Sequence, residues 1–164
     1  MTNSDCAVLF DLDGTLVDSA PDFHRIINQL LRQYQAAEVD YSIIRQTASN
    51  GSRAMIEAAL SDNNPALCVD MMLPEFLKFY HEKPVMSGGL FEGLDTLLHW
   101  LDQNEISWGI VTNKPRYLSE AVLEQLKLTE SCSVLVCPED IARAKPDPEG
   151  LVFAAKQLGL TQSH

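Results

Sequence analysis

The sequence has few basic residues and no long apolar segment. Its 164 residues include 12 lysines and arginines against 23 aspartates and glutamates, which gives a formal net charge of −11. Such a surplus of negative charge repels nucleic acids and anionic membranes over most of a protein surface. No apolar segment approaches the roughly 20 residues that a membrane-spanning helix needs. We therefore expect neither a nucleic-acid nor a membrane partner, and an anionic substrate must meet a local group of cations or a metal.

Paired cysteine motifs are also lacking. The four cysteines contain no Cys-x-x-Cys pair, and Cys132 and Cys137 have no nearby histidines that would complete a zinc site. The favoured interpretation is scattered buried thiols in a reducing cytosol. The N-terminus has no basic region, and its apolar run 7–10 stops at Asp11, so it does not read as a signal peptide. We expect a cytoplasmic protein.

Apolar spacing divides the chain into two kinds of segment. Residues 7–10 form a continuous apolar run, as in a strand buried on both faces. Residues from about 19 to 82 then repeat apolar side chains at helical intervals, with Pro21 suited to an early helical position and Ser19 to a cap. The apolar positions are Phe23, Ile26, Ile27, Leu30, Leu31, Met55, Ile56, Ala59, Leu60, Phe76, Leu77 and Tyr80. This pattern predicts a small, all-helical insertion.

From residue 83 onward, helix and strand patterns alternate. The expected order is helix 94–103, strand 108–111, helix 118–126, strand 134–136 and helix 149–158. Such alternation indicates an α/β fold with a parallel sheet. We therefore predict a core domain formed by 1–18 with 83–164, and a helical domain formed by 19–82.

The strongest chemical signal is Asp11-Leu12-Asp13-Gly14-Thr15, directly after the first predicted strand. Two carboxylates two residues apart lie on a tight loop in which Gly14 permits backbone conformations that other residues resist. Parallel sheets place their chemistry at this edge. A calcium site or an exposed turn remains an alternative for this motif taken alone.

Two further motifs follow later strands. Thr112-Asn113-Lys114 offers a hydroxyl, an amide and backbone N–H groups at a helix start, where anions bind readily. Lys145-Pro146-Asp147-Pro148 places a lysine in a loop that two prolines stiffen. Each is weak alone, because Thr and Asn often cap helices and loop lysines are usually solvated. Their order, each after a predicted strand, favours a phosphate site.

Together the three motifs resemble those of the haloacid dehalogenase superfamily, and the likeness runs from about Ala7 to the last residue. Within the superfamily the sequence is most similar to the phosphoglycolate phosphatase group, including a bacterial branch that dephosphorylates N-acetylmuramic acid 6-phosphate. The resemblance implies a Rossmann-like parallel sheet with a small helical cap inserted after the first strand. It also implies a small phosphorylated metabolite as substrate.

The resemblance further implies a mechanism. Asp11 would attack phosphorus to form an aspartyl-phosphate, and Asp13 would act as general acid and base. Mg²⁺ would be held by Asp11 and the backbone carbonyl of Asp13. Lys145 would offset negative charge on the nucleophile and the transferring group. The residues expected to hold phosphate are Gly14, Thr15, Thr112 and Asn113.

The family pattern includes a fourth motif, an acidic pair after one further strand. No acidic residue follows Glu149, so we expect a third acidic metal ligand and the final strands to be absent from this chain. A sugar-phosphate mutase, which would share these motifs, and an inactive fragment that only binds phosphate or a partner therefore stay open.

Substrate choice in this family lies in the cap, where Asn50-Gly51-Ser52-Arg53 opens a helix. Ser52 and Arg53 are candidate substrate-binding residues, because an arginine can clamp a carboxylate with two hydrogen bonds. Such a contact suits phosphoglycolate and the lactyl acid of N-acetylmuramic acid 6-phosphate alike. A solvated arginine at a helix end is the equally weighted alternative.

Overall fold

The computed structural model describes residues 6–60 and 67–160. Two compact units divide the chain, with boundaries at Val17/Asp18 and Gly89/Leu90. One unit is α/β and the other is helical. Two short strands, β2 (Val17–Asp18) and β3 (Gly89–Leu90), pair with each other at these boundaries. The predicted limits of a core and a cap domain stay a prediction.

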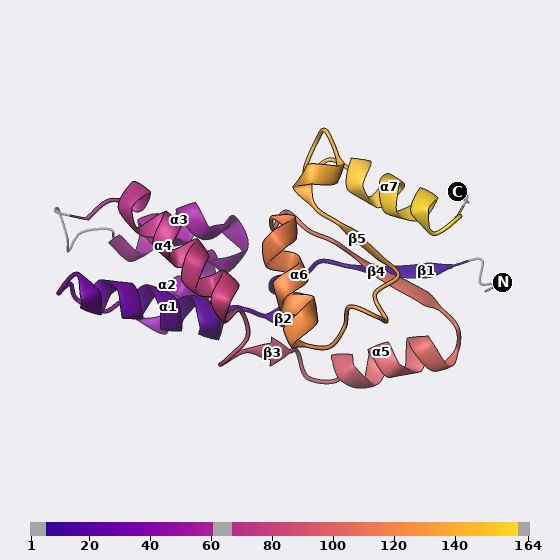
Figure 1. The fold of residues 1–164 in the computed structure, drawn as a ribbon, viewed down its shortest axis with the longest axis horizontal. Coiled ribbons are helices and arrows are strands. Elements are labelled where there is room, and N and C mark those ends of the chain that lie inside the picture. The colour runs from indigo at the N-terminus through magenta and orange to yellow at the C-terminus, as the bar shows by residue number, and fades with distance from the viewer. Residues whose placement is uncertain (1–5, 61–66, 161–164) are drawn as a thin grey trace. The chain divides into compact units, whose positions relative to one another are not determined.

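The α/β unit contains a parallel sheet of three strands in the order β1-β4-β5 (Figure 1). These strands are β1 (Ala7–Phe10), β4 (Ser107–Val111) and β5 (Val134–Val136). Its helices are α5 (Leu94–Gln103), α6 (Arg116–Gln125), the short η2 (Pro138–Asp140) and α7 (Glu149–Gln157). The alternating pattern therefore correctly predicted an α/β fold with a parallel sheet.

Close packing in this sheet depends on a glycine in its central strand. Gly109 pairs with Leu9 on one side and Val134 on the other. A Cβ atom there would lie 2.3 Å from Cγ1 of Val134, so no larger residue fits without a shift. Val111, Val136 and Ala154 form a buried cluster that attaches α7 to the sheet. This close packing fixes the positions of the three strands relative to one another, and so of the loops that follow them.

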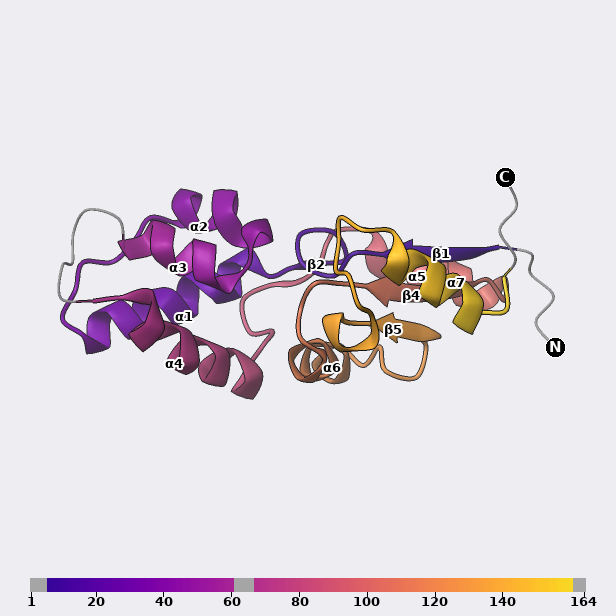
Figure 2. The same cartoon turned by 90° about the horizontal axis from the view of Figure 1, so that it is seen from above.

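The helical unit contains α1 (Ala20–Gln33), α2 (Tyr41–Thr47), η1 (Ala48–Asn50), α3 (Ser52–Leu60) and α4 (Val69–Glu82), which Figure 2 shows from above. Helices α1 and α4 pack through aromatic rings, because Phe23 lies against both Phe76 and Tyr80. Ser19 occupies the N-cap position of α1, but its side chain makes no capping hydrogen bond. That detail of the sequence prediction was wrong.

The cysteines differ from expectation. Cys137 is buried, but Cys6 and Cys68 are exposed, and none of the four cysteines forms a disulfide bond. Burial raises the pKa of Cys137 to about 11, which keeps it a thiol at neutral pH. The prediction of buried thiols therefore fails for Cys6 and Cys68. None of the helices among the described residues is long and apolar enough to cross a membrane.

A buried carboxylate organises the C-terminal end of the helical unit. Asp22 in the first turn of α1 is 1% exposed. Its oxygens accept hydrogen bonds from the backbone N–H groups of Met86, Ser87 and Gly88 at 2.9, 3.0 and 2.9 Å. The segment that leads into β3 is thus fastened to α1. A buried carboxylate with three backbone donors is well satisfied, so it stabilises the fold.

Asp22→Ala should lower the free energy of unfolding by at least ~2 kcal/mol, because three backbone donors lose their acceptor at a buried site. Asp70→Ala is the matched control, since Asp70 is 79% exposed and has an exposed ion-pair partner. Its effect should stay within ~0.5 kcal/mol. Urea denaturation of both variants measures the difference, and equal stabilities would contradict the anchoring role of Asp22.

Candidate active site

The loop after β1 folds back tightly on itself. The N–H of Leu16 donates to the carbonyl of Asp11 at 3.2 Å, and the N–H of Gly14 donates to the carbonyl of Val17 at 2.9 Å. Gly14 has φ +80°, a left-handed conformation in which a side chain would be strained. This turn exposes Asp11 and leaves Asp13 half-buried on the same loop. Thr15 is exposed beside them.

Lys145 reaches the first of these carboxylates. Its Nζ lies 2.6 Å from Oδ1 of Asp11, and the two side chains are 28% and 44% exposed. The same oxygen, Oδ1, also accepts a hydrogen bond from the backbone N–H of the next residue, Leu12, at 2.8 Å. The first and third sequence motifs therefore meet in space, although 134 positions separate them. This pair places a cation directly beside the predicted nucleophile.

Asn113 links the loop after β4 to the loop that carries Lys145. Its side-chain amide donates to the carbonyl of Lys145 at 3.0 Å, and its side-chain oxygen accepts from the N–H of Lys145 at 3.0 Å. The side chain predicted to hold phosphate thus contacts backbone instead, and its contact with phosphate stays a prediction. The Lys145–Pro146 peptide bond is cis.

Glu149, the first residue of α7, fixes the earlier part of the same loop. Its carboxylate accepts hydrogen bonds from the N–H groups of Ala142 and Arg143 at 2.9 and 3.1 Å. The bond from Ala142 is the main cause that holds the pKa of Glu149 below its ordinary value. Glu149 therefore restrains the loop just before Lys145, and Asn113 restrains the backbone of Lys145 itself.

A second lysine meets the second carboxylate, which sequence reasoning did not foresee. Nζ of Lys114 donates to both oxygens of Asp13, at 2.9 and 3.1 Å. The N–H of Lys114 donates to Oγ1 of Thr112 at 3.1 Å, so the predicted phosphate-binding threonine, which is buried, also shapes this loop. The signal in the sequence was the position of Lys114 directly after Thr112-Asn113.

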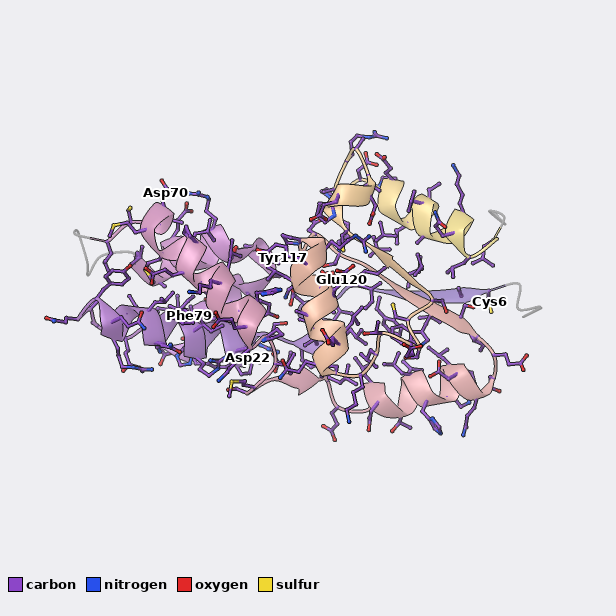
Figure 3. All side chains as sticks on the ribbon, viewed as in Figure 1. Cys6, Asp22, Asp70, Phe79, Tyr117 and Glu120 are labelled. Carbon is purple, nitrogen blue, oxygen red and sulfur yellow. The ribbon has the colours of Figure 1, made fainter. Side chains whose placement is uncertain are left out.

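The predicted cap residues lie in the helical unit. Ser52 begins α3, and Arg53 forms an ion pair with Asp70 at 2.8 Å. Asp70 lies in the first turn of α4 (Figure 3). The Arg53 side chain is 57% exposed, so this pair contributes little stability and leaves the guanidinium near solvent. Substrate contact by either residue stays a prediction.

The oxygen atoms available near Asp11 and Asp13 limit how a metal ion could be held. Asp11 and Asp13 supply hard oxygen donors on one loop, as Mg²⁺ prefers. In residues 6–60 and 67–160 no group of three or more His, Cys, Asp or Glu side chains gathers as a metal site. Mg²⁺ often takes one or two carboxylates and completes its shell with waters and substrate phosphate. The two aspartates fit that mode of binding.

Together these contacts form a cluster of charged side chains at the carboxyl edge of the parallel sheet. It holds two acids, Asp11 and Asp13, each paired with its own lysine. One acid is exposed enough to act as a nucleophile, and the other lies close enough along the chain to move protons. Displacement at phosphorus or carbon is the chemistry that such a site can perform.

Comparison with known proteins places the chain in a family. Residues 8–164 match the family model described as haloacid dehalogenase-like hydrolase. The chain therefore belongs to the haloacid dehalogenase-like hydrolase family, as its motifs led us to expect.

Individual relatives agree. An N-acetylmuramic acid 6-phosphate phosphatase of Pseudomonas putida is 40% identical over 94% of this chain and 69% of its own length. A phosphoglycolate phosphatase of Xanthomonas campestris pv. campestris gives the same identity and coverage. The crystal structure of a predicted phosphoglycolate phosphatase from Haemophilus somnus superposes with a TM-score of 0.81 at 22% identity, over 96% of this chain and 74% of that one. That likeness shows the shared fold.

Asn113→Ala should loosen the Lys145 loop, because it removes both side-chain hydrogen bonds to the Lys145 backbone. We expect faster hydrogen exchange at the Lys145 amide and a stability loss of about 1–2 kcal/mol. Mass spectrometry of exchanged peptides measures the first effect. Asn104→Ala is the control, since Asn104 follows α5 and its side chain donates to the carbonyl of Trp100 within that helix, away from the Lys145 loop. Unchanged exchange at Lys145 in Asn113→Ala would contradict the link.

Proposed function

We propose that this protein is a Mg²⁺-dependent phosphatase that hydrolyses a small phosphomonoester through an aspartyl-phosphate on Asp11. The observation that carries the proposal is the pairing of Asp11 with Lys145 and of Asp13 with Lys114 at one sheet edge. An exposed carboxylate beside a cation is suited to approach a phosphate dianion, which a bare carboxylate would repel. The named relatives support the same class of reaction.

The proposed reaction has two displacements. In the first, an oxygen of Asp11 bonds to phosphorus and the bond from phosphorus to the leaving oxygen breaks, with its electron pair passing to that oxygen. Asp13 gives the leaving oxygen a proton. In the second, water bonds to the same phosphorus, gives a proton to Asp13, and the acyl-phosphate bond to Asp11 breaks. Phosphate leaves, and both aspartates return to their starting state.

Cations near the phosphoryl group would lower the activation free energy of both displacements. Lys145 would offset charge on Asp11 and on the phosphoryl oxygens as they approach each other. Asp11 and the backbone carbonyl of Asp13 would hold Mg²⁺, which supplies further neutralisation of phosphate charge when bound. Gly14, Thr15, Thr112 and Asn113 are the proposed phosphate-contacting residues, through hydroxyl and backbone N–H groups.

We propose a phosphorylated metabolite that carries a carboxylate as the substrate, with phosphoglycolate first and N-acetylmuramic acid 6-phosphate as the alternative. Support comes from the two relatives, which match the chain equally well and carry these two substrates in their names. A cytoplasmic location fits the exposed free thiol of Cys68, because such a thiol persists in a reducing compartment.

Phosphate release from both candidate substrates should depend on Mg²⁺ and on Asp11. Asp11→Asn should lower kcat by at least roughly 10³-fold, since the amide cannot act as the nucleophile. A chelator should abolish release and added Mg²⁺ should restore it. Asp95→Asn, an exposed substitution on α5, is the matched control and should keep full activity. Undiminished release by Asp11→Asn would exclude the proposed nucleophile.

Arg53 offers a test of carboxylate recognition. Arg53→Met should raise KM for phosphoglycolate by roughly tenfold or more, because a bidentate contact with the carboxylate is lost. Ethyl phosphate, which has no carboxylate, should show the same KM with either protein. Steady-state kinetics on the two substrates gives the comparison, with Arg32→Met as the surface control. A parallel rise in both KM values would rule out selective carboxylate binding by Arg53.

A further inference from the structure

Lys114 is a buried cation whose position the phosphatase mechanism does not require. Only 6% of its side chain is exposed, against 28% for Lys145. A lysine is rarely buried to this extent, because its charge loses water and needs a partner. Here the partner is Asp13, the proposed acid and base, which lies 101 positions earlier in the chain. The cost of burying this charge suggests a role for the pair.

The backbone of Lys114 is held as firmly as its side chain. Its N–H donates to Oγ1 of Thr112, and its carbonyl accepts from Oγ of the buried Ser119 at 3.3 Å. The ammonium therefore projects from a fixed point at the end of β4. It contacts both carboxylate oxygens of Asp13, at 2.9 and 3.1 Å, which restrains rotation of the carboxylate plane.

The orientation of the Asp13 carboxyl group matters for its proposed role in proton transfer. Its carboxyl group must face the leaving oxygen in the first displacement and the attacking water in the second. One oxygen can keep a hydrogen bond from Lys114 while the other carries the proton. Lys145 already serves Asp11, so the two lysines have different carboxylates and different tasks.

We propose that Lys114 is a positioning residue that orients the carboxyl group of Asp13 for proton transfer. It acts on the two steps that move a proton, and it does not bind the phosphoryl group. This inference rests on the proposed phosphatase function and adds a residue to it. The alternative role, direct contact of Lys114 with phosphate, is distinguished by the kinetics of the two displacements.

The test compares Lys114→Met with the unchanged protein on two esters. An alkyl phosphate such as phosphoglycolate has a poor leaving group, so its first displacement needs a proton. 4-Nitrophenyl phosphate has a good leaving group and does not need one. Lys114→Met should therefore keep the burst rate of nitrophenol release but lower steady-state turnover of both esters by roughly 10- to 100-fold. For 4-nitrophenyl phosphate, KM should fall together with kcat, because kcat/KM depends only on binding and the first displacement, which the variant leaves unchanged. For phosphoglycolate, kcat/KM should fall, because its first displacement needs the proton from Asp13.

Four further variants control the result. Lys156→Met removes an exposed lysine of the same unit and should leave all rates unchanged. Lys114→Gln keeps an N–H donor and should lose less turnover than Lys114→Met, and it carries the test if the methionine variant fails to fold. In an Asp13→Asn background, Lys114→Met should add no further loss of steady-state turnover, because its effect passes through Asp13.

A slower nitrophenol burst, a large rise in KM for both esters, or an additive loss in the Asp13→Asn background would overturn the positioning role. Thermal unfolding of the unchanged protein, Lys114→Met, Asp13→Asn and the double variant measures the coupling of Lys114 with Asp13 without any reliance on turnover. Absence of that coupling would also overturn the proposal. If the unchanged protein and Lys156→Met both release no phosphate while the coupling is present, the proposed function fails and the catalytic role of Lys114 fails with it.

Discussion

The parallel register of β1, β4 and β5 is the constraint on which the candidate site depends. Because Leu9, Gly109 and Val134 lie abreast, the loops after these strands all emerge at one edge of the sheet. Gly109 permits the close approach of Val134 that this register requires. Asp11 follows β1 and Thr112 follows β4, so sheet geometry brings both residues to this edge before any side-chain contact forms.

Much of this arrangement follows from local sequence pattern. The limits of β1 and β5 agree with the predicted strands, and α5 begins and ends where its apolar spacing predicted. Short apolar runs next to acidic or polar loops are strong signals, because burial and chain reversal are both local effects. The two-residue strands β2 and β3 were not predicted, since two residues carry no periodicity.

The contacts that complete the site could not be predicted in the same way. Lys114 looked like part of an ordinary helix start, and its bond to Asp13 depends on strand pairing between distant segments. Asn113 looked like a phosphate ligand by residue type, yet its amide matches the backbone of Lys145 in both directions. A donor and an acceptor on one side chain suit either task, so only the fold decides between them.

The proposed roles of Asp11 and Asp13 place different demands on the cation beside each carboxylate. In the proposed mechanism Asp11 is exposed and able to approach phosphorus, which suits a cation on a loop that Asn113 and Glu149 restrain. In the same proposal Asp13 keeps its orientation while it loses and regains a proton, which suits a buried cation fixed just after the central strand β4. A single shared lysine would have to move between the two acids as charge shifts from one to the other. Separate lysines on the loop after β4 and on the loop before α7 remove that conflict, because each cation can stay with the carboxylate whose proposed task it supports.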